Sequence, residues 1–143
     1  MKKRNLIVTS LLIVMAFAMA LCGCAGSSYS RIKAAYEGKE YEESAKIEEY
    51  QTMINNALGE DFESACNVHC LRNGLNVALI LEFKSTTKME EAFENSETLK
   101  GFLKDLDNKG VTEAIQNCEL VNGNCVLLFY TPLSNALDIF KNA

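Results

Sequence analysis

Tryptophan is absent from this chain, and proline and histidine occur once each, as Pro132 and His69. The lack of tryptophan and the scarcity of proline argue against an aromatic sugar-binding platform and a proline-rich wall linker. A single histidine removes most histidine-based proton relays. Also missing are a glycine-rich phosphate loop, a His-Glu-x-x-His helix, a Gly-x-Ser-x-Gly elbow and a calcium-binding loop. We therefore expect a protein that is not an enzyme and carries no cofactor.

Basic residues are outnumbered by acidic ones, with 14 Lys and Arg against 19 Asp and Glu. Removal of the three basic residues at positions 2–4 with a signal peptide leaves 11 against 19. Nucleic-acid binding and broad adhesion to anionic lipid both need basic patches. Neither is expected of this chain. The acidic cluster from Glu37 to Glu49 is interpreted as solvated surface.

The N-terminal segment has the plan of a secretory signal. Residues 2–4 form a basic head, and residues 6–21 are apolar apart from Thr9 and Ser10. These 16 residues fall short of the roughly 20 that span a bilayer as a helix. The segment is therefore interpreted as a cleaved signal rather than a membrane span.

The residues around Cys24 sharpen this interpretation. Leu21, Cys22 and Gly23 precede Cys24, with a large aliphatic residue first and a small one last, and this order resembles the lipobox of bacterial lipoproteins. The resemblance implies that the Cys24 thiol receives a diacylglyceryl group and that signal peptidase II cuts between Gly23 and Cys24, so that residues 1–23 are the signal peptide. Cys22 is a rival site, but it would place Leu21 at the cut, where a small residue is wanted. A plain secretory signal with a chance cysteine is the other alternative.

On the lipobox interpretation, the protein is anchored by lipid to the cell membrane and faces outside the cytoplasm. Two or three acyl chains hold a protein far more firmly than one chain does. Residues 24–43 are small, polar and charged without an apolar repeat, and we expect a flexible tether that turns helical near its end. Residues 44–143 are expected to form one small domain. Its first helix is predicted over residues 44–58, with Gly59 as the stop.

A β-hairpin is the clearest local prediction. Asn73-Gly74 lies between two alternating runs, residues 65–72 and 75–83, and Asn-Gly is the preferred type I′ turn. A two-residue turn at this place pairs Cys70 with Val77. One face of the hairpin is then largely apolar and the other is mixed.

A second helix is predicted after this hairpin. Thr87 and Glu90 form a capping box at its start. Asn95-Ser96 is a weak point in its interior, where the helix can break, and Gly110 is the predicted end.

A second hairpin and a terminal helix complete the predicted domain. Asn122-Gly123 joins residues 114–121 to residues 124–131, and Thr131 with Pro132 predicts the start of the last helix. The fold class is therefore α+β, in the order helix, hairpin, helix, hairpin, helix. We expect a four-stranded, mainly antiparallel sheet with helices packed on it. The mixed sheet face is either a protein-contact surface or the seat of a covering helix; its apolar residues are Leu71, Ala78, Ile80, Val126 and Leu128.

Four cysteines fall in the expected domain: Cys66, Cys70, Cys118 and Cys125. Outside the cytoplasm they are candidates for disulfides. Cys66 and Cys70 lie about 13 Å apart along one strand, beyond the roughly 7 Å that a disulfide allows, and Cys118 and Cys125 lie on a poor diagonal. A bond from Cys66 or Cys70 to Cys118 stays open. All four are expected on the apolar face, where a thiol packs as a small hydrophobe, and packing is the preferred interpretation.

Metal binding is a further alternative for these cysteines. Zinc sites draw ligands from closely spaced pairs on turns, whereas a strand holds Cys66 and Cys70 too far apart for one ion. His69 faces the opposite side and is expected to be an exposed sheet histidine rather than a ligand. No metal site is therefore expected.

Together these features predict a lipid-anchored protein with a non-enzymatic binding or structural role in the cell envelope. The alternative is a thiol-based redox or metal-handling lipoprotein that uses the four domain cysteines. The expected partners are the membrane, through the N-terminal lipid, and an envelope protein; nucleic acid is not expected. The helix–hairpin order and the Ile-Glu-Glu-Tyr segment at residues 47–50 resemble uncharacterised small lipoproteins of Gram-positive gut bacteria. This resemblance implies no known activity.

Overall fold

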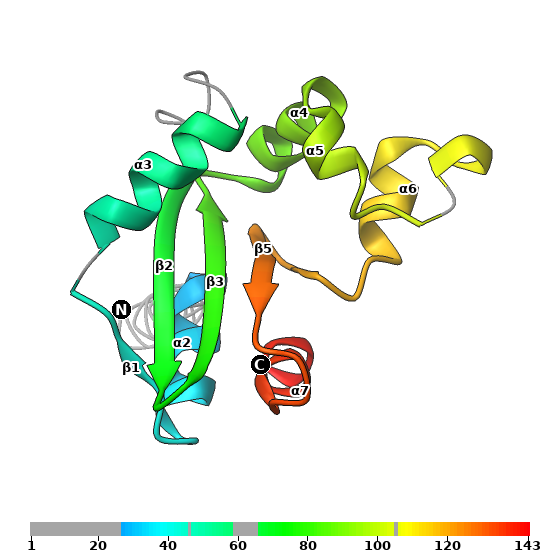
Figure 1. The fold of residues 1–143 in the computed structure, drawn as a ribbon. Coiled ribbons are helices and arrows are strands. Elements are labelled where there is room, and N and C mark those ends of the chain that lie inside the picture. The colour runs from blue at the N-terminus through cyan, green and yellow to red at the C-terminus, as the bar shows by residue number, and fades with distance from the viewer. Residues whose placement is uncertain (1–26, 46, 59–65, 105) are drawn as a thin grey trace, which may run out of the picture.

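The computed structural model describes residues 27–45, 47–58, 66–104 and 106–143 (Figure 1). Within these ranges it has an α+β fold with six α-helices and a five-stranded antiparallel sheet. The elements in chain order are α2 (Ser28–Glu37), β1 (Glu42–Glu43), α3 (Ile47–Leu58), β2 (Cys66–Asn73), β3 (Asn76–Phe83), α4 (Thr86–Asn95), α5 (Glu97–Lys100), the short 3₁₀ helix η2 (Leu106–Asn108), α6 (Val111–Gln116), β4 (Val121–Asn122), β5 (Cys125–Tyr130) and α7 (Ala136–Asn142). The predicted fold class is confirmed.

The sheet has the strand order β1-β2-β3-β5-β4, with every neighbouring pair antiparallel. The long hairpin β2–β3 forms its centre, as the Asn-Gly turn predicts (Figure 1). The fifth strand, β1, was not expected. It pairs Glu42 with Arg72 and Glu43 with Leu71 along the outer edge of β2.

The predicted hairpin register is wrong by two residues. Asn73 pairs with Asn76, so the two turn residues are Gly74 and Leu75, and Cys70 lies opposite Leu79 instead of Val77. Gly74 has a φ of +59° and takes the first turn position, where a type II′ turn prefers glycine. A two-residue shift preserves the side-chain alternation, so the predicted faces of this hairpin stand.

Two apolar layers lie on opposite faces of the sheet. The first cluster contains Cys66, Val68, Cys70, Leu79, Leu81 and Phe83 of the hairpin, covered by residues of α3, α4, α5 and α6. The second cluster contains Leu71, Ala78, Ile80 and Leu127 of the sheet, covered by residues of α2 and α7. Figure 1 shows α2 behind the hairpin and α3 in front of it. Within the described part of the chain, helices therefore cover both faces of the sheet, and the mixed face is the seat of covering helices.

The prediction of a flexible tether over residues 24–43 is wrong for residues 28–37, which form helix α2. Ser27 caps this helix, since its Oγ accepts a hydrogen bond from the backbone N–H of Ser30 at 3.2 Å. Tyr29, Ile32 and Tyr36 share one helical face and are buried against the sheet. Residues 27–43 therefore pack as part of the domain, because burial of these three apolar side chains stabilises α2 against the sheet.

The predicted first strand of the second hairpin is also corrected. Residues 111–116 form α6, with Ala114 and Ile115 buried at helical spacing. Gly110 caps the start of this helix instead of ending the preceding one. Only Val121–Asn122 remain as a strand, β4, paired with Cys125 and Val126 of β5.

An irregularity in the β3–β5 ladder changes the faces of β5. Leu79 pairs with Phe129 but Ile80 pairs with Leu127, so Leu128 is skipped. Residues of β5 before this bulge are displaced to the opposite face relative to those after it. Cys125 therefore lies in the second cluster, away from the cysteines of β2.

The remaining helix predictions have mixed outcomes. Ser85, not Thr87, caps α4, and the break predicted at Asn95-Ser96 is confirmed, since Ser96 caps the separate helix α5. The last helix begins at Ala136 instead of Pro132. Leu133 lies in the intervening turn, fully exposed and with a φ of +66°. Among the residues described, no helix is both long and apolar enough to cross a bilayer.

Candidate functional site

The mixed face of the hairpin is covered and does not form a contact surface. Leu71, Ala78 and Ile80 have no exposed surface, because α2 and α7 pack over them. Val126 and Leu128, which were expected on the same face, pack with the first cluster instead, as the bulge in β5 requires.

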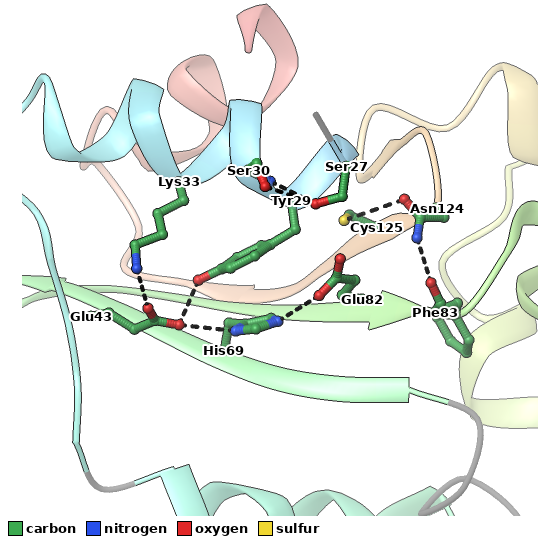
Figure 2. Close-up of polar contacts among 10 residues, drawn as sticks. All are labelled: Ser27, Tyr29, Ser30, Lys33, Glu43, His69, Glu82, Phe83, Asn124 and Cys125. Carbon is green, nitrogen blue, oxygen red and sulfur yellow. Dashed lines mark hydrogen bonds and ion pairs between the residues drawn. The ribbon is translucent and has the colours of Figure 1, made fainter. Parts of the chain in front are cut away.

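A cluster of five polar side chains lies at this covered interface (Figure 2). We call it the His69 cluster. Its members come from four elements: Tyr29 and Lys33 from α2, Glu43 from β1, His69 from β2 and Glu82 from β3. Hydrogen bonds and ion pairs connect all five side chains.

Each ring nitrogen of His69 contacts a carboxylate, and one face of the ring stacks on a tyrosine. Its Nδ1 lies 2.9 Å from Oε1 of Glu43 and its Nε2 lies 2.9 Å from Oε2 of Glu82. The ring stacks on Tyr29, with 3.5 Å between the ring centroids and 15° between the planes. A ring with two N–H groups donates to both carboxylates, whereas a neutral ring donates to only one. Each ring nitrogen of His69 therefore faces one carboxylate oxygen that can accept its hydrogen.

Glu43 is the most connected member of the cluster. Its carboxylate accepts hydrogen bonds from Tyr29 Oη at 2.7 Å and from Lys33 Nζ at 2.6 Å, besides its contact with His69. Burial by itself raises the pKa of Glu43, but the hydrogen bonds from Lys33, Tyr29 and His69 outweigh it and lower the pKa to about 2. Burial and the hydrogen bond to Glu43 raise the pKa of Tyr29. Glu43 is therefore ionised and Tyr29 neutral at physiological pH.

This arrangement is better suited to holding α2 against the sheet than to catalysis. Both ring nitrogens of His69 face carboxylates, so neither is open to activate a nucleophile. The side chains of His69, Glu43 and Glu82 are only 15–24% exposed, which leaves little access for a substrate. What the cluster does is join α2 to three strands of the sheet.

The four domain cysteines do not share one face, contrary to expectation. Cys66 and Cys70 are buried in the first cluster, and Cys118 packs at its border. Cys118 lies outside the sheet, where its thiol donates to the carbonyl oxygen of Phe102 at 3.4 Å. Cys125 is fully buried in the second cluster. Among Cys70, Cys118 and Cys125 the structure forms no disulfide.

Burial makes these thiols poor nucleophiles. It raises the pKa of Cys66 to about 11 and also raises the pKa of Cys70 and Cys118. Burial and the neighbouring Glu82 carboxylate raise the pKa of Cys125 to about 12. Since the thiolate is the reactive form, this set of cysteines is suited to packing. In the described part of the chain, no three or more His, Cys, Asp or Glu residues gather as metal ligands.

Sequence reasoning missed the His69 cluster and placed His69 on an exposed surface. A signal is present in the sequence, because strand alternation places Glu82 on the same face of the hairpin as His69. The partners from α2 and β1 could not be found, since residues 24–43 were interpreted as a tether. The predicted lipidation and cleavage residues, Gly23 and Cys24, lie outside the described residues.

No family model, curated protein or solved structure matches this chain.

Proposed function

We propose that this protein is a lipid-anchored domain on the outer face of the cytoplasmic membrane, with a non-enzymatic binding or structural role in the cell envelope. The proposal depends on the short distance in sequence between the lipobox-like residues and the first described helix. The lipobox-like residues 21–24 are followed at Ser27 by the cap of the first described helix. The attachment point thus lies next to the folded domain in sequence.

The way in which α2 is held supports an anchoring role. Its inner face is buried in the second cluster, and Tyr36 Oη donates to the carbonyl oxygen of Ala136 at 2.6 Å. The helix is also joined to the sheet by the His69 cluster, through Tyr29 and Lys33. A lipid attached three residues before Ser27 would therefore hold the whole domain, and not a loose arm of it.

The state of the cysteines supports the non-enzymatic part of the proposal over a thiol-based redox or metal-handling role. Cys66, Cys70 and Cys125 are at most 5% exposed, and burial raises the pKa of each thiol. Reactive cysteines sit in accessible, electropositive surroundings that lower the thiol pKa.

Three exposed apolar side chains support the binding part of the proposal. Leu75, Phe129 and Leu133 are 91%, 53% and 106% exposed. Thr131 brings their segments together, because its Oγ1 accepts from the backbone N–H of Val77 at 2.9 Å and donates to the carbonyl oxygen of Leu75 at 3.3 Å. The three side chains are thus carried by segments at one end of the sheet, where they offer exposed apolar surface to another protein.

Metabolic labelling tests the anchor. Cells that express the full chain and are fed radiolabelled palmitate should yield a labelled protein in the membrane fraction. The Cys24→Ser variant should be unlabelled, whereas Cys22→Ser, the matched control, should label normally. Labelling that survives in Cys24→Ser, or is lost only in Cys22→Ser, would contradict the assignment of Cys24.

A further inference from the structure

We infer that the anchored domain stands with one particular end against the lipid headgroups. This end, which we call the anchor end, is formed by Ser27, Asn67, Lys84 and Asn124. The turn at Leu75 then points away from the membrane. The inference rests on the proposed lipidation of Cys24 and goes beyond it, because lipidation alone does not orient a domain.

The chain between the proposed lipid attachment at Cys24 and the fold is short, which limits how the domain can turn on the membrane. Cys24 and Ser27 are three residues apart. Three residues span at most about 11 Å in any conformation. A lipidated Cys24 lies at the headgroups, so Ser27 must lie within that distance of them. The tether of about twenty residues that the sequence suggested would have left the domain free to turn.

The residues around Ser27 identify the end that must follow it. A pocket of about 420 Å³ at this place is lined by Ser27, Cys66, Asn67, Glu82, Phe83, Lys84 and Asn124. Besides Ser27, the lining residues come from the start of β2, the end of β3 with the residue after it, and the turn before β5. Figure 2 shows Ser27, Asn124 and Phe83 on the same side of the His69 cluster.

Direct contacts fix α2 to this end of the sheet. A Cβ on Gly123 would come 2.0 Å from Oγ of Ser28, so the β4–β5 turn and the first residue of α2 touch. The backbone N–H of Phe83 donates to the carbonyl oxygen of Asn124 at 2.9 Å, and the side-chain amide of Asn124 donates to the carbonyl oxygen of Phe83. Direct contacts therefore hold the end of β3, the β4–β5 turn and the start of α2 together.

The opposite end is the length of the central hairpin away. Each of β2 and β3 has eight residues, which is about 23 Å by the rise of a strand. Leu75 lies in the turn beyond them. The short link, and not charge, enforces this orientation, since the predicted mature chain is acidic and is not attracted to anionic lipid.

Single tryptophans test the orientation, since the chain has none of its own. Lys84→Trp and Leu75→Trp place a probe at exposed positions of the two ends. The full-length lipidated variants are reconstituted into phosphatidylcholine–phosphatidylglycerol vesicles that carry nitroxide-labelled headgroups. We expect the tryptophan fluorescence of Lys84→Trp to be quenched several-fold more strongly than that of Leu75→Trp, at low and at high salt alike. Equal quenching in the two variants, or stronger quenching in Leu75→Trp, would overturn the inference.

A spacer supplies the matched control. Twenty Gly-Ser residues inserted between Gly26 and Ser27 have a root-mean-square length of about 25 Å. They should abolish the difference between the two probes while the protein still floats with the vesicles. A difference that survives the spacer would mean that the domain surface itself binds lipid and would overturn the role given to the short link.

Flotation separates this inference from the proposed function. A protein that floats with vesicles but shows the same quenching at both positions contradicts the orientation alone. A protein that does not float, or that floats equally well as Cys24→Ser, contradicts the lipid anchor. Circular dichroism of each variant establishes that the fold is retained.

Discussion

His69 on β2 lies flat against Tyr29 on α2, with their ring centroids 3.5 Å apart. The two residues are far apart in the chain, and both bind the same carboxylate oxygen, Oε1 of Glu43. The contact joins the first described helix to a central strand of the sheet. Its stability consequences can be measured.

Removal of the imidazole should destabilise the domain. In His69→Ala the carboxylate of Glu82 loses its contact with the imidazole Nε2, and Tyr29 loses its stacking contact. We expect a loss of about 1–3 kcal/mol in the free energy of unfolding, because a partly buried charge is left unpaired. Urea unfolding followed by circular dichroism measures this loss. His69→Phe restores stacking without the N–H groups and should recover only part of it.

A surface ion pair provides the control for this variant. Lys88 and Glu91 are 2.5 Å apart on the exposed side of α4, and both are about half exposed. Lys88→Ala should cost less than about 0.5 kcal/mol. Comparable losses for Lys88→Ala and His69→Ala would argue against a special role for the His69 cluster.

The ionisation of Glu43 should make stability depend on pH in the acid range. Its pKa falls from an ordinary value of 4.5 to about 2 in the folded protein. A carboxyl with a depressed folded-state pKa contributes stability above its unfolded-state pKa and loses it as the pH falls. We therefore expect stability to drop by about 2–3 kcal/mol between pH 4.5 and pH 2 through this group. In Glu43→Gln the midpoint in urea should be lower at neutral pH and should change less over the same pH range.

Alanine at Gly123 should be costly. Both Gly74 and Gly123 have φ near +60°, at +59° and +61°. An alanine in this conformation costs about 1 kcal/mol. At Gly74 nothing lies within 4 Å of the new Cβ, whereas at Gly123 it meets Ser28 at 2.0 Å. Gly123→Ala should therefore lose clearly more stability than Gly74→Ala, and equal losses in thermal melts would show that α2 is not seated against this turn.

Native-state alkylation should rank the thiols by exposure. Cys118 is the most accessible of the four domain cysteines and should react first with iodoacetamide. Cys66, Cys70 and Cys125 are buried, and burial raises the pKa of each thiol, so they should react only as the domain opens. Mass spectrometry of digests measures the order, and denatured protein supplies the reference in which all four react. Rapid labelling of Cys125 in the native protein would contradict the packing described for the second cluster.

The sequence predicted elements where short-range chemistry decides the structure. Asn73-Gly74 predicted the central hairpin, and Asn95-Ser96 predicted the break between α4 and α5. The register was wrong because glycine can take either turn position, and the pattern of faces is the same after a two-residue shift. Local signals were also sufficient for the fold class.

The sequence failed where a distant contact decides the structure. Helix α2 has only three buried residues on its face, which fall among polar neighbours, so its stability comes from packing against the sheet and α7. The His69 cluster depends on that packing, because two of its members lie on α2. The bulge in β5, which moves Cys125 to the second cluster, has no signature in the sequence.

The contact between α2 and α7 also sets an order of assembly. Tyr36 of α2 is held by the backbone of Ala136, 100 positions later in the chain, and Arg31 reaches the carbonyl oxygen of Ala143. During the export that we propose, the N-terminal segment crosses the membrane before α7 can arrive. Until then α2 lacks the helix that packs against it, so the domain closes only after the segment proposed for acylation and cleavage has been exported. If the chain is exported as we propose, its two ends are thus joined last, after the proposed processing site has passed the membrane.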